Sequence, residues 1–452
     1  MKKILYTLIC GTVLCCAACR KYVEIPPENL KVLSATSDYQ ALLNYGITFE
    51  VSYSSPVLSS DDMGTDEVVW QNPLNVLSAN AYTWADRMYE AAAEDNEWSK
   101  FYNTIFNCNV VINGVMDSQG GTDQQKRRAL AEALVHRAYS YFTLVNMYAK
   151  QYDPATAATD PGLPLVLTPR FTTDLTRVSV QKIYNQIKAD LNAALPDLAD
   201  RADFITNPSK TAVYALLART YLNTREFSEA QRNSELALSL QNTLIDLKAY
   251  TAPNVTFPNR LTNPEEIFFK RTASYLPNVP INANTISIYD LNDLRYQLYT
   301  ADRTKSNAPF NNRVFYKHRL SVDGAYVGPS VPEMMLIKAE CEARADKPDA
   351  AINTLNELRK KRFDDAHYVG LTASTGNEAL HRVIDERTRE FIGRGFRWFD
   401  QRRLRQDPGF ITTVTRVFKD VTYTLTPESN RYTYRIAEKY IQLNPEIVQN
   451  PR

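Results

Sequence analysis

The stretch ALLARTYLNTREFSEAQRNSELAL, residues 215–238, decides the fold class of this chain. It combines parts of two segments with helical apolar periodicity, 209–224 and 226–240, which are joined by a short polar turn. Small residues stand at the positions where two helices would cross. LIKAECEARADKPDAAINTLNEL, residues 336–358, has the same layout. The sequence therefore predicts a mainly α fold in which helical hairpins recur.

The predicted hairpins are irregular and number about four. They cover residues 98–148, 180–224, 227–239 with 331–344, and 348–403. Units of this kind resemble tetratricopeptide repeats, in which each hairpin buries a face only by stacking on its neighbours. Two stretches without helical period, 50–95 and 241–330, are predicted to be long loop insertions with minor β structure. We expect residues 35–452 to form a single domain.

Composition and motifs exclude several classes of function. A formal net charge of +1 over 452 residues provides no basic field for nucleic acid. The four histidines are far apart in the sequence, and there is no His-Glu-x-x-His, Gly-x-Ser-x-Gly or phosphate-loop motif. The acidic stretch SSDDMGTDE, 59–67, lacks the ligand spacing of a calcium loop and is predicted to be a solvated loop. The sequence thus predicts no enzyme, no cofactor and no metal.

The N-terminus predicts export and lipidation. Two lysines, an apolar run and small residues make 1–18 a signal peptide. The residues before Cys19 resemble a lipobox, so Cys19 is the predicted lipidation site and 19–34 the tether that follows it. Cys108 and Cys341 then remain in the mature chain. Their apolar helical surroundings favour buried free thiols, with a single disulfide as the alternative.

Several motifs occur in an order that is specific when they are taken together. They are CRKYVEIPP (19–27), WSKFYNTIFNCNVVI (98–112), AEALVHRAYSYFTLVNMY (131–148), GLPLVLTP (162–169), RVSVQKIYNQIKADLNAALPDL (177–198), ERTREFIGRGFRWFDQRR (386–403) and LNPEIVQNP (443–451). With them the chain resembles the SusD/RagB family of outer-membrane nutrient-binding lipoproteins. It departs from the family pattern at YRIAEKYIQ (434–442), and it is short for the family. Shorter loops leave the ligand class open.

The resemblance implies a role and a location. Family members are lipid-anchored at the outer membrane, face the cell exterior and cap a TonB-dependent transporter of the SusC type. They bind glycans or oligosaccharides without catalysis and deliver them to the transporter. Three alternatives stay open: a RagB-like protein that binds peptides, a surface hydrolase, and a repeat scaffold without a small ligand.

Glycan capture requires exposed aromatic rings that stack on sugars, beside polar groups that bind hydroxyls. We therefore predict ligand contacts among residues outside the helical repeats: Trp84, Tyr82, Trp70, Asn80, Arg87, Tyr275 and Tyr289. The segment EFIGRGFRWFDQRR is interpreted as structural. Residues 377–404 are predicted to form one helix, in which Glu390 and Arg394 pair at a spacing of four and Trp398 and Phe399 pack inward.

Overall fold

A computed structural model describes residues 33–170, 174–253, 255–259, 262–273, 278–316 and 324–452. The predicted signal peptide 1–18, Cys19, nearly all of the predicted tether and Tyr275 lie outside these described residues.

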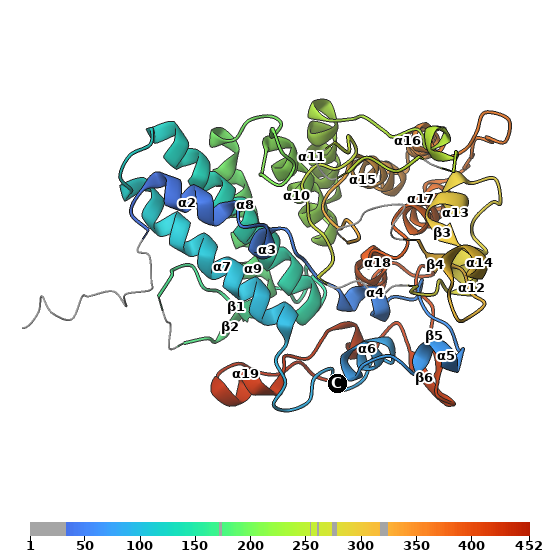
Figure 1. Cartoon of the computed structure of the whole chain (residues 1–452), viewed down its shortest axis with the longest axis horizontal. Helices are drawn as coiled ribbons and strands as arrows, with labels where there is room; N and C mark the ends of the chain where they lie inside the picture. Colours follow the sequence, from blue (N-terminus) through green and yellow to red (C-terminus); the bar gives the residue numbers. More distant parts are fainter. Residues whose placement is uncertain (1–32, 171–173, 254, 260–261, 274–277, 317–323) are drawn as a thin grey trace, which may run out of the picture.

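The long helices form one continuous array (Figure 1). They are α7 (Asn96–Gly114), α8 (Asp123–Tyr148), α9 (Val180–Ala194), α10 (Lys210–Asn223), α11 (Phe227–Leu240), α15 (Val331–Arg344), α16 (Pro348–Arg359) and α17 (Gly376–Glu390). Each packs on the next in this order, and α15 also packs on α17. The predicted mainly α fold class is confirmed.

Shorter elements surround the array. The helices are α2 (Thr36–Leu43), α3 (Gly46–Phe49), α4 (Ser55–Ser59), α5 (Val68–Gln71), α6 (Val76–Tyr82), α12 (Ala283–Ile286), α13 (Leu294–Leu298), α14 (Arg303–Ser306), α18 (Phe396–Leu404) and α19 (Glu438–Leu443). The named strands of the described residues form three antiparallel pairs: β1 (Pro161–Pro164) with β2 (Arg177–Ser179), β3 (Thr300–Ala301) with β4 (Val314–Phe315), and β5 (Val414–Phe418) with β6 (Val421–Leu425). The sequence did not predict the β5–β6 hairpin.

Local sequence signals fix where the long helices begin. The Asp95 carboxylate accepts hydrogen bonds from the backbone N–H groups of Glu97 and Trp98 at the start of α7. Thr122 forms a capping box with Gln125 at the start of α8. Such caps satisfy N–H groups that have no partner within the helix, so they define the helix start.

Residues from three sequence motifs meet between α7, α8 and α9. Arg137 on α8 donates two hydrogen bonds to Asp190 on α9, of 2.8 and 2.7 Å, and a third of 2.8 Å to the side-chain oxygen Oδ1 of Asn109 on α7. The Asn109 amide donates to the backbone of Val166, after β1. One buried guanidinium therefore joins all three helices, which explains why these polar residues stand on otherwise apolar helix faces.

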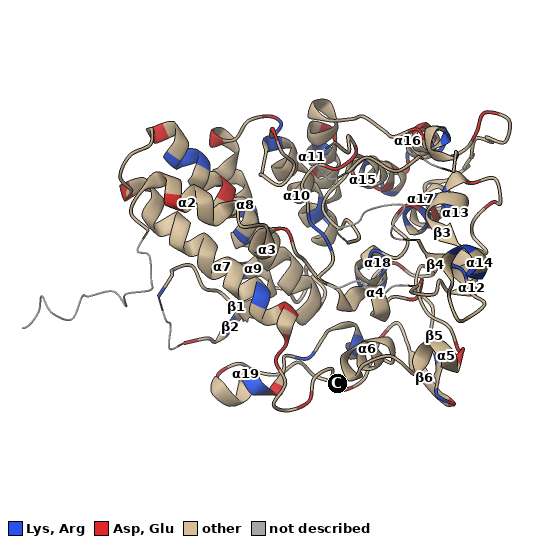
Figure 2. Cartoon of the chain, in the orientation of Figure 1, with Lys and Arg blue, Asp and Glu red and all other residues tan. Residues whose placement is uncertain are grey.

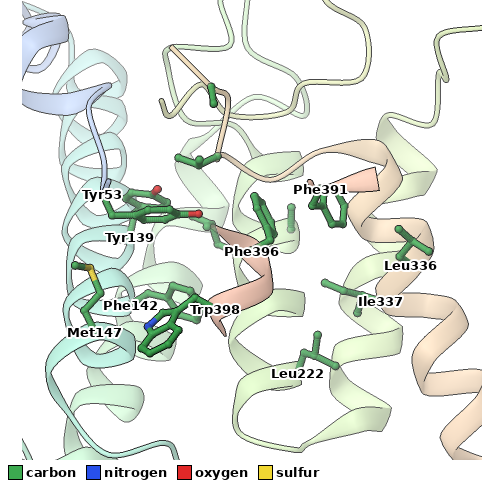
Figure 3. Close-up of a cluster of buried hydrophobic side chains, with 14 of the residues drawn as sticks. Tyr53, Tyr139, Phe142, Met147, Leu222, Leu336, Ile337, Phe391, Phe396 and Trp398 are labelled. Carbon is green, nitrogen blue, oxygen red and sulfur yellow. The ribbon is translucent and has the colours of Figure 1, made fainter. Parts of the chain in front are cut away.

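Part of the main hydrophobic core lies between the array and α18. Figure 3 shows Trp398 of α18 facing Phe142 and Met147 of α8. Trp398 is fully buried and also stacks on Tyr434 near the C-terminus, with ring centroids 5.6 Å apart. This single side chain links the array to the C-terminal segment.

The structure divides the predicted 377–404 helix at residues 391–395. Gly393 and Gly395 have φ values of +72° and +77°, a left-handed conformation that interrupts a right-handed helix. A Cβ on Gly393 would also lie 2.5 Å from Phe315, so this site excludes a side chain. The predicted Glu390–Arg394 helical pair is therefore wrong, and Glu390 instead binds Arg295 and Arg362.

Cys108 and Cys341 are buried free thiols, as predicted. Within the described part of the chain, no helix has both the length and the apolar character that a membrane crossing requires. Charges of both signs are interspersed along the visible elements, as the near-zero net charge suggests (Figure 2).

Candidate ligand-binding site

The predicted aromatic ligand contacts Tyr82 and Trp84 enclose an arginine of the protein itself. The Arg416 guanidinium lies 4.2 Å from the centre of the Tyr82 ring and 4.4 Å from that of Trp84. It donates hydrogen bonds to backbone carbonyls that include those of Leu58 and Met63. A cation on the face of an aromatic ring is a favourable contact, so these ring faces already have an occupant.

The prediction that these aromatic rings are exposed is wrong. Trp84 is 4% exposed and Tyr82 2%. Trp70 is equally buried and packs edge-on against Tyr82, with centroids 5.0 Å apart. The Trp84 indole N–H donates to the backbone carbonyl of Ser59 at 2.8 Å, and the Tyr82 hydroxyl to that of Thr65 at 3.1 Å. These three residues hold the loops together from inside.

The other predicted contacts lie in different environments. Tyr289 is buried, contrary to the prediction, and its hydroxyl donates to the backbone carbonyl of Arg389 at 2.7 Å. Asn80 is half-buried and donates to the carbonyl of Met88. Arg87 is exposed. The predicted set is therefore not gathered into one open surface.

Most of the acidic stretch 59–67 is buried and only Asp66 is exposed, so its prediction as a solvated loop is wrong. Asp62 is buried, and its carboxylate accepts hydrogen bonds from the Ser60 hydroxyl and the backbone N–H of Gly393. Burial raises the pKa of Asp62 to about 6. Asp61 forms a two-point ion pair with Arg397, with N–O distances of 2.7 and 2.8 Å. Within the described residues, no group of three or more potential ligands is placed to hold a metal ion.

Beside Asp61 opens a polar hollow of about 320 Å³, which we call the α12–α17 pocket. Five segments form its walls: Asp61 shortly after α4, α12 with Ile288 that follows it, the outer face of α17, Arg397 of α18, and the chain that leads into and begins β5. Its lining residues are Asp61, Asn282, Asn284, Thr285, Ile288, His381, Ile384, Asp385, Thr388, Arg397, Phe410, Thr412, Thr413, Val414 and Thr415.

The pocket combines a flat ring pair with polar groups. His381 and Phe410 stack with centroids 4.2 Å apart and ring planes only 9° apart. Asn284, Thr412 and Thr413 are exposed around them. Amide, hydroxyl and carboxylate groups beside an aromatic face are the chemistry that binds a polyhydroxylated ligand. A second, apolar cavity beside α4 and α6 holds only about 60 Å³, too little for a sugar ring.

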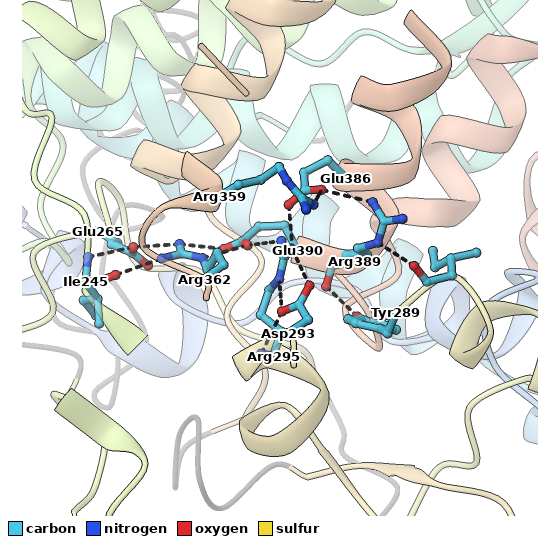
Figure 4. Close-up of polar contacts among 11 residues, drawn as sticks. Ile245, Glu265, Tyr289, Asp293, Arg295, Arg359, Arg362, Glu386, Arg389 and Glu390 are labelled. Carbon is cyan, nitrogen blue, oxygen red and sulfur yellow. Dashed lines mark hydrogen bonds and ion pairs between the residues drawn. The ribbon is translucent and has the colours of Figure 1, made fainter. Parts of the chain in front are cut away.

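A buried network of ion pairs holds one wall of this pocket in place (Figure 4). Arg295 is fully buried and binds Asp293, Glu386 and Glu390. Arg389 bonds to Glu386 at 3.0 Å and donates to the backbone carbonyl of Ile288, a pocket residue, at 2.8 Å. The charges of α17 therefore fix the segment that follows α12.

Sequence reasoning missed most of this pocket. Residues 282–288 fall within the predicted 241–330 loop insertion and Asp61 within 50–95, but Phe410, His381 and the threonines were not singled out. The stretch DPGFITTVT, 407–415, offered a signal, because an aromatic and three threonines follow a Pro-Gly turn.

Two family models match successive parts of the chain. One, described as starch-binding associating with outer membrane, matches residues 26–222. The other, described as SusD family, matches residues 331–452. Together these ranges span well over half of the chain. No curated protein matches it.

Solved structures share the fold over nearly the whole chain. A SusD superfamily protein from Bacteroides thetaiotaomicron is 20% identical with a TM-score of 0.73, and the match covers 92% of this chain and 100% of that one. A putative sugar binding protein from Bacteroides vulgatus is 19% identical with a TM-score of 0.73, covering 93% and 99%. A laminarin binding SusD-like protein is 17% identical with a TM-score of 0.65, covering 92% and 99%. With both family models matched in order and this fold shared, the chain belongs to the SusD/RagB family.

Proposed function

We propose that the protein captures a nutrient glycan or oligosaccharide at the cell surface and delivers it to a SusC-type TonB-dependent transporter. In this role it is a lipoprotein of the outer membrane, anchored through Cys19, and it binds without catalysis. The observation that carries the proposal is the α12–α17 pocket, in which the stacked His381–Phe410 pair lies among amide and hydroxyl groups. Family membership supports the same role.

The position of the pocket in the sequence supports a role in ligand choice. Its α12 wall, residues 282–288, lies between the ranges that the two family models match. Its other walls come from the matched parts. The pocket therefore combines segments that the family shares with a loop that the family models do not match. Such an arrangement suits a family whose members differ in ligand, because loops carry specificity while the scaffold is kept.

The polar groups of the pocket can contribute to binding in different ways. Arg397 is held by Asp61, so its orientation is fixed before a ligand arrives. The exposed Asn284 and Thr413 face water and can exchange those hydrogen bonds for bonds to sugar hydroxyls. We propose that Arg87, which is exposed at the surface, contributes only if a longer glycan extends beyond the pocket.

The test is calorimetry of the purified protein against a panel of oligosaccharides and peptides. Phe410→Ala should weaken glycan binding at the pocket more than about a hundredfold, beyond detection by calorimetry, and Asn284→Ala about tenfold, roughly 1.4 kcal/mol. The matched controls are Phe106→Ala on α7 and Asn192→Ala on α9, both at exposed positions away from the pocket, and they should bind as the wild type does. Binding of peptides and of no glycan would replace this proposal with the peptide-uptake alternative.

A further inference from the structure

A second polar hollow, which we call the Phe204 groove, holds about 520 Å³. It lies between α2, α3, the first turns of α8 and residues 203–207. Figure 1 shows α2 and α12 near opposite ends of the long axis of the molecule, so the Phe204 groove and the α12–α17 pocket are separate sites.

The polar wall of the Phe204 groove is held in position by a buried carboxylate. Glu132, which is 1% exposed, accepts a hydrogen bond of 2.9 Å from the Gln40 amide and another of 2.9 Å from Nε of Arg128. The Gln40 amide also donates to the Asn44 side chain at 3.2 Å. Among the described residues, the two Nη groups of Arg128 have no hydrogen-bond partner, so they remain available to a ligand.

The apolar element of the groove is the Phe204 side chain, which is 56% exposed. Its backbone is fixed by a turn, because the Asn207 N–H donates to the Phe204 carbonyl at 2.9 Å. The next carbonyl, that of Ile205, accepts from the N–H of Phe269 at 2.7 Å. A braced turn thus presents an aromatic ring to water at the edge of a polar groove.

We propose that the Phe204 groove is a second carbohydrate-binding site. This inference rests on the proposed function and extends it, since one polysaccharide could then bind the protein at two separate points. An aromatic ring beside amide, guanidinium and carboxylate groups matches the surface of a sugar. An extended peptide would instead need an open strand edge to pair with, and none of the residues that line the groove belongs to a described strand.

Two sites on one molecule have a measurable consequence. A short oligosaccharide binds each site independently, whereas a polysaccharide that engages both sites gains from the high effective concentration at the second. Loss of either site should therefore leave short ligands bound at the other site but weaken polysaccharide binding more than tenfold.

The experiment measures the stoichiometry of binding to the full protein, with laminarin and starch and with oligosaccharides cut from each as probes. For a glycan that binds, the wild type should take up two oligosaccharides per chain. Phe204→Ala and Phe410→Ala should each take up one, and the double variant none. Phe204→Trp retains a ring and should restore two, while the exposed control Phe106→Ala should leave the stoichiometry at two.

Three results would overturn the inference. A stoichiometry of one that Phe410→Ala abolishes and Phe204→Ala leaves unchanged would remove the second site and keep the proposed function. A Phe204 groove that binds peptides and no glycan would do the same. Failure of the wild type to bind any oligosaccharide or polysaccharide of a broad panel would overturn both proposals together.

Discussion

Helices α8 and α17 both lie within the array, but they are buried by different means. From Ala129 to Tyr148, α8 is buried on nearly every side, mostly through apolar residues, and Glu132, His136 and Arg137 are its buried acidic and basic residues. Helix α17 buries Glu386, Arg387 and Glu390.

The charges of α17 meet partners from distant segments. Glu386 binds Arg295, Arg359 and Arg389, and Glu390 binds Arg295 and Arg362. Apolar contacts accept many shapes, whereas a buried charge requires one partner at one place. Helix α8 is therefore held mainly by apolar packing, whereas the ion pairs of α17 fix a loop that forms part of the α12–α17 pocket.

Among the substitutions considered, Arg295→Met should destabilise the ion-pair network of α17 most. The substitution leaves Asp293, Glu386 and Glu390 buried without their shared partner. We expect the free energy of unfolding to fall by about 3–5 kcal/mol, measured by urea denaturation at pH 7. The control is Arg382→Met, which removes an exposed ion pair from the same helix and should cost less than about 0.5 kcal/mol. Equal effects of the two variants would show that burial of the Arg295 charge adds nothing to the stability of this region.

The corresponding substitution on α8 is Leu144→Ala, which removes apolar packing. Leu144 is fully buried, so its truncation leaves a cavity and should reduce the free energy of unfolding by about 3 kcal/mol. Leu443→Ala, at an exposed position, is the control. Unlike an effect on the charged side, this loss should stay the same between pH 7 and pH 3. A loss that changed with pH would show that the packing of Leu144 is coupled to a titrating group.

Acidification should weaken the ion pairs that Asp400 forms with Arg387 of α17 and with Arg403, and so lower the stability of this region. Burial alone would raise the pKa of Asp400, but Arg387 and Arg403 outweigh it and lower the pKa to about 2. Because the folded pKa lies below the ordinary value of 3.8, the stabilisation is full above about pH 4 and is lost as the pH falls towards 2.

The comparison of wild type with Asp400→Asn tests this effect. The difference between their unfolding free energies should shrink by about 2 kcal/mol from pH 5 to pH 2, as followed by urea denaturation. Arg387 and Arg403 remain in place in both proteins, so they do not account for the change. A difference that stayed constant with pH would show that Asp400 does not titrate in this range.

A small effect on the free energy of unfolding is expected when an exposed ion pair of α8 is removed. Arg127 on α8 binds Asp197 at 3.0 Å, with 47% of the Arg127 side chain exposed. Solvent screens such a pair, so Arg127→Met should change the free energy of unfolding by less than about 1 kcal/mol. If urea denaturation showed a loss of unfolding free energy as large as that of Arg295→Met, burial would not explain why the ion pairs of α17 stabilise the protein strongly.

Prediction from sequence succeeded where signals are local. Helix periodicity and the apolar surroundings of Cys108 and Cys341 each lie within one element, and the long helices and the free thiols followed. It failed at the 391–395 break, because Gly393 takes its conformation together with Phe315, which lies far away in the sequence. A helical period continues across such a glycine even when the helix does not.

The candidate site shows the same limit. Tyr82 and Trp84 were predicted to bind ligand because they are aromatic and lie outside the repeats. Whether their rings are exposed depends on which distant residues pack against them. The covering residue, Arg416, is separated from Tyr82 by 334 positions. The α12–α17 pocket likewise joins Asp61, α12, α17 and the start of β5, and no local pattern places these segments together.

The amino-acid sequence was enough to predict the long helices, their order and the family, because apolar periodicity and motif order are properties of neighbouring residues. Only the tertiary structure decided which aromatic rings are buried, where α17 ends and which polar residues share a pocket. The physical reason is that burial and charge pairing are set by segments that meet only when the chain has folded.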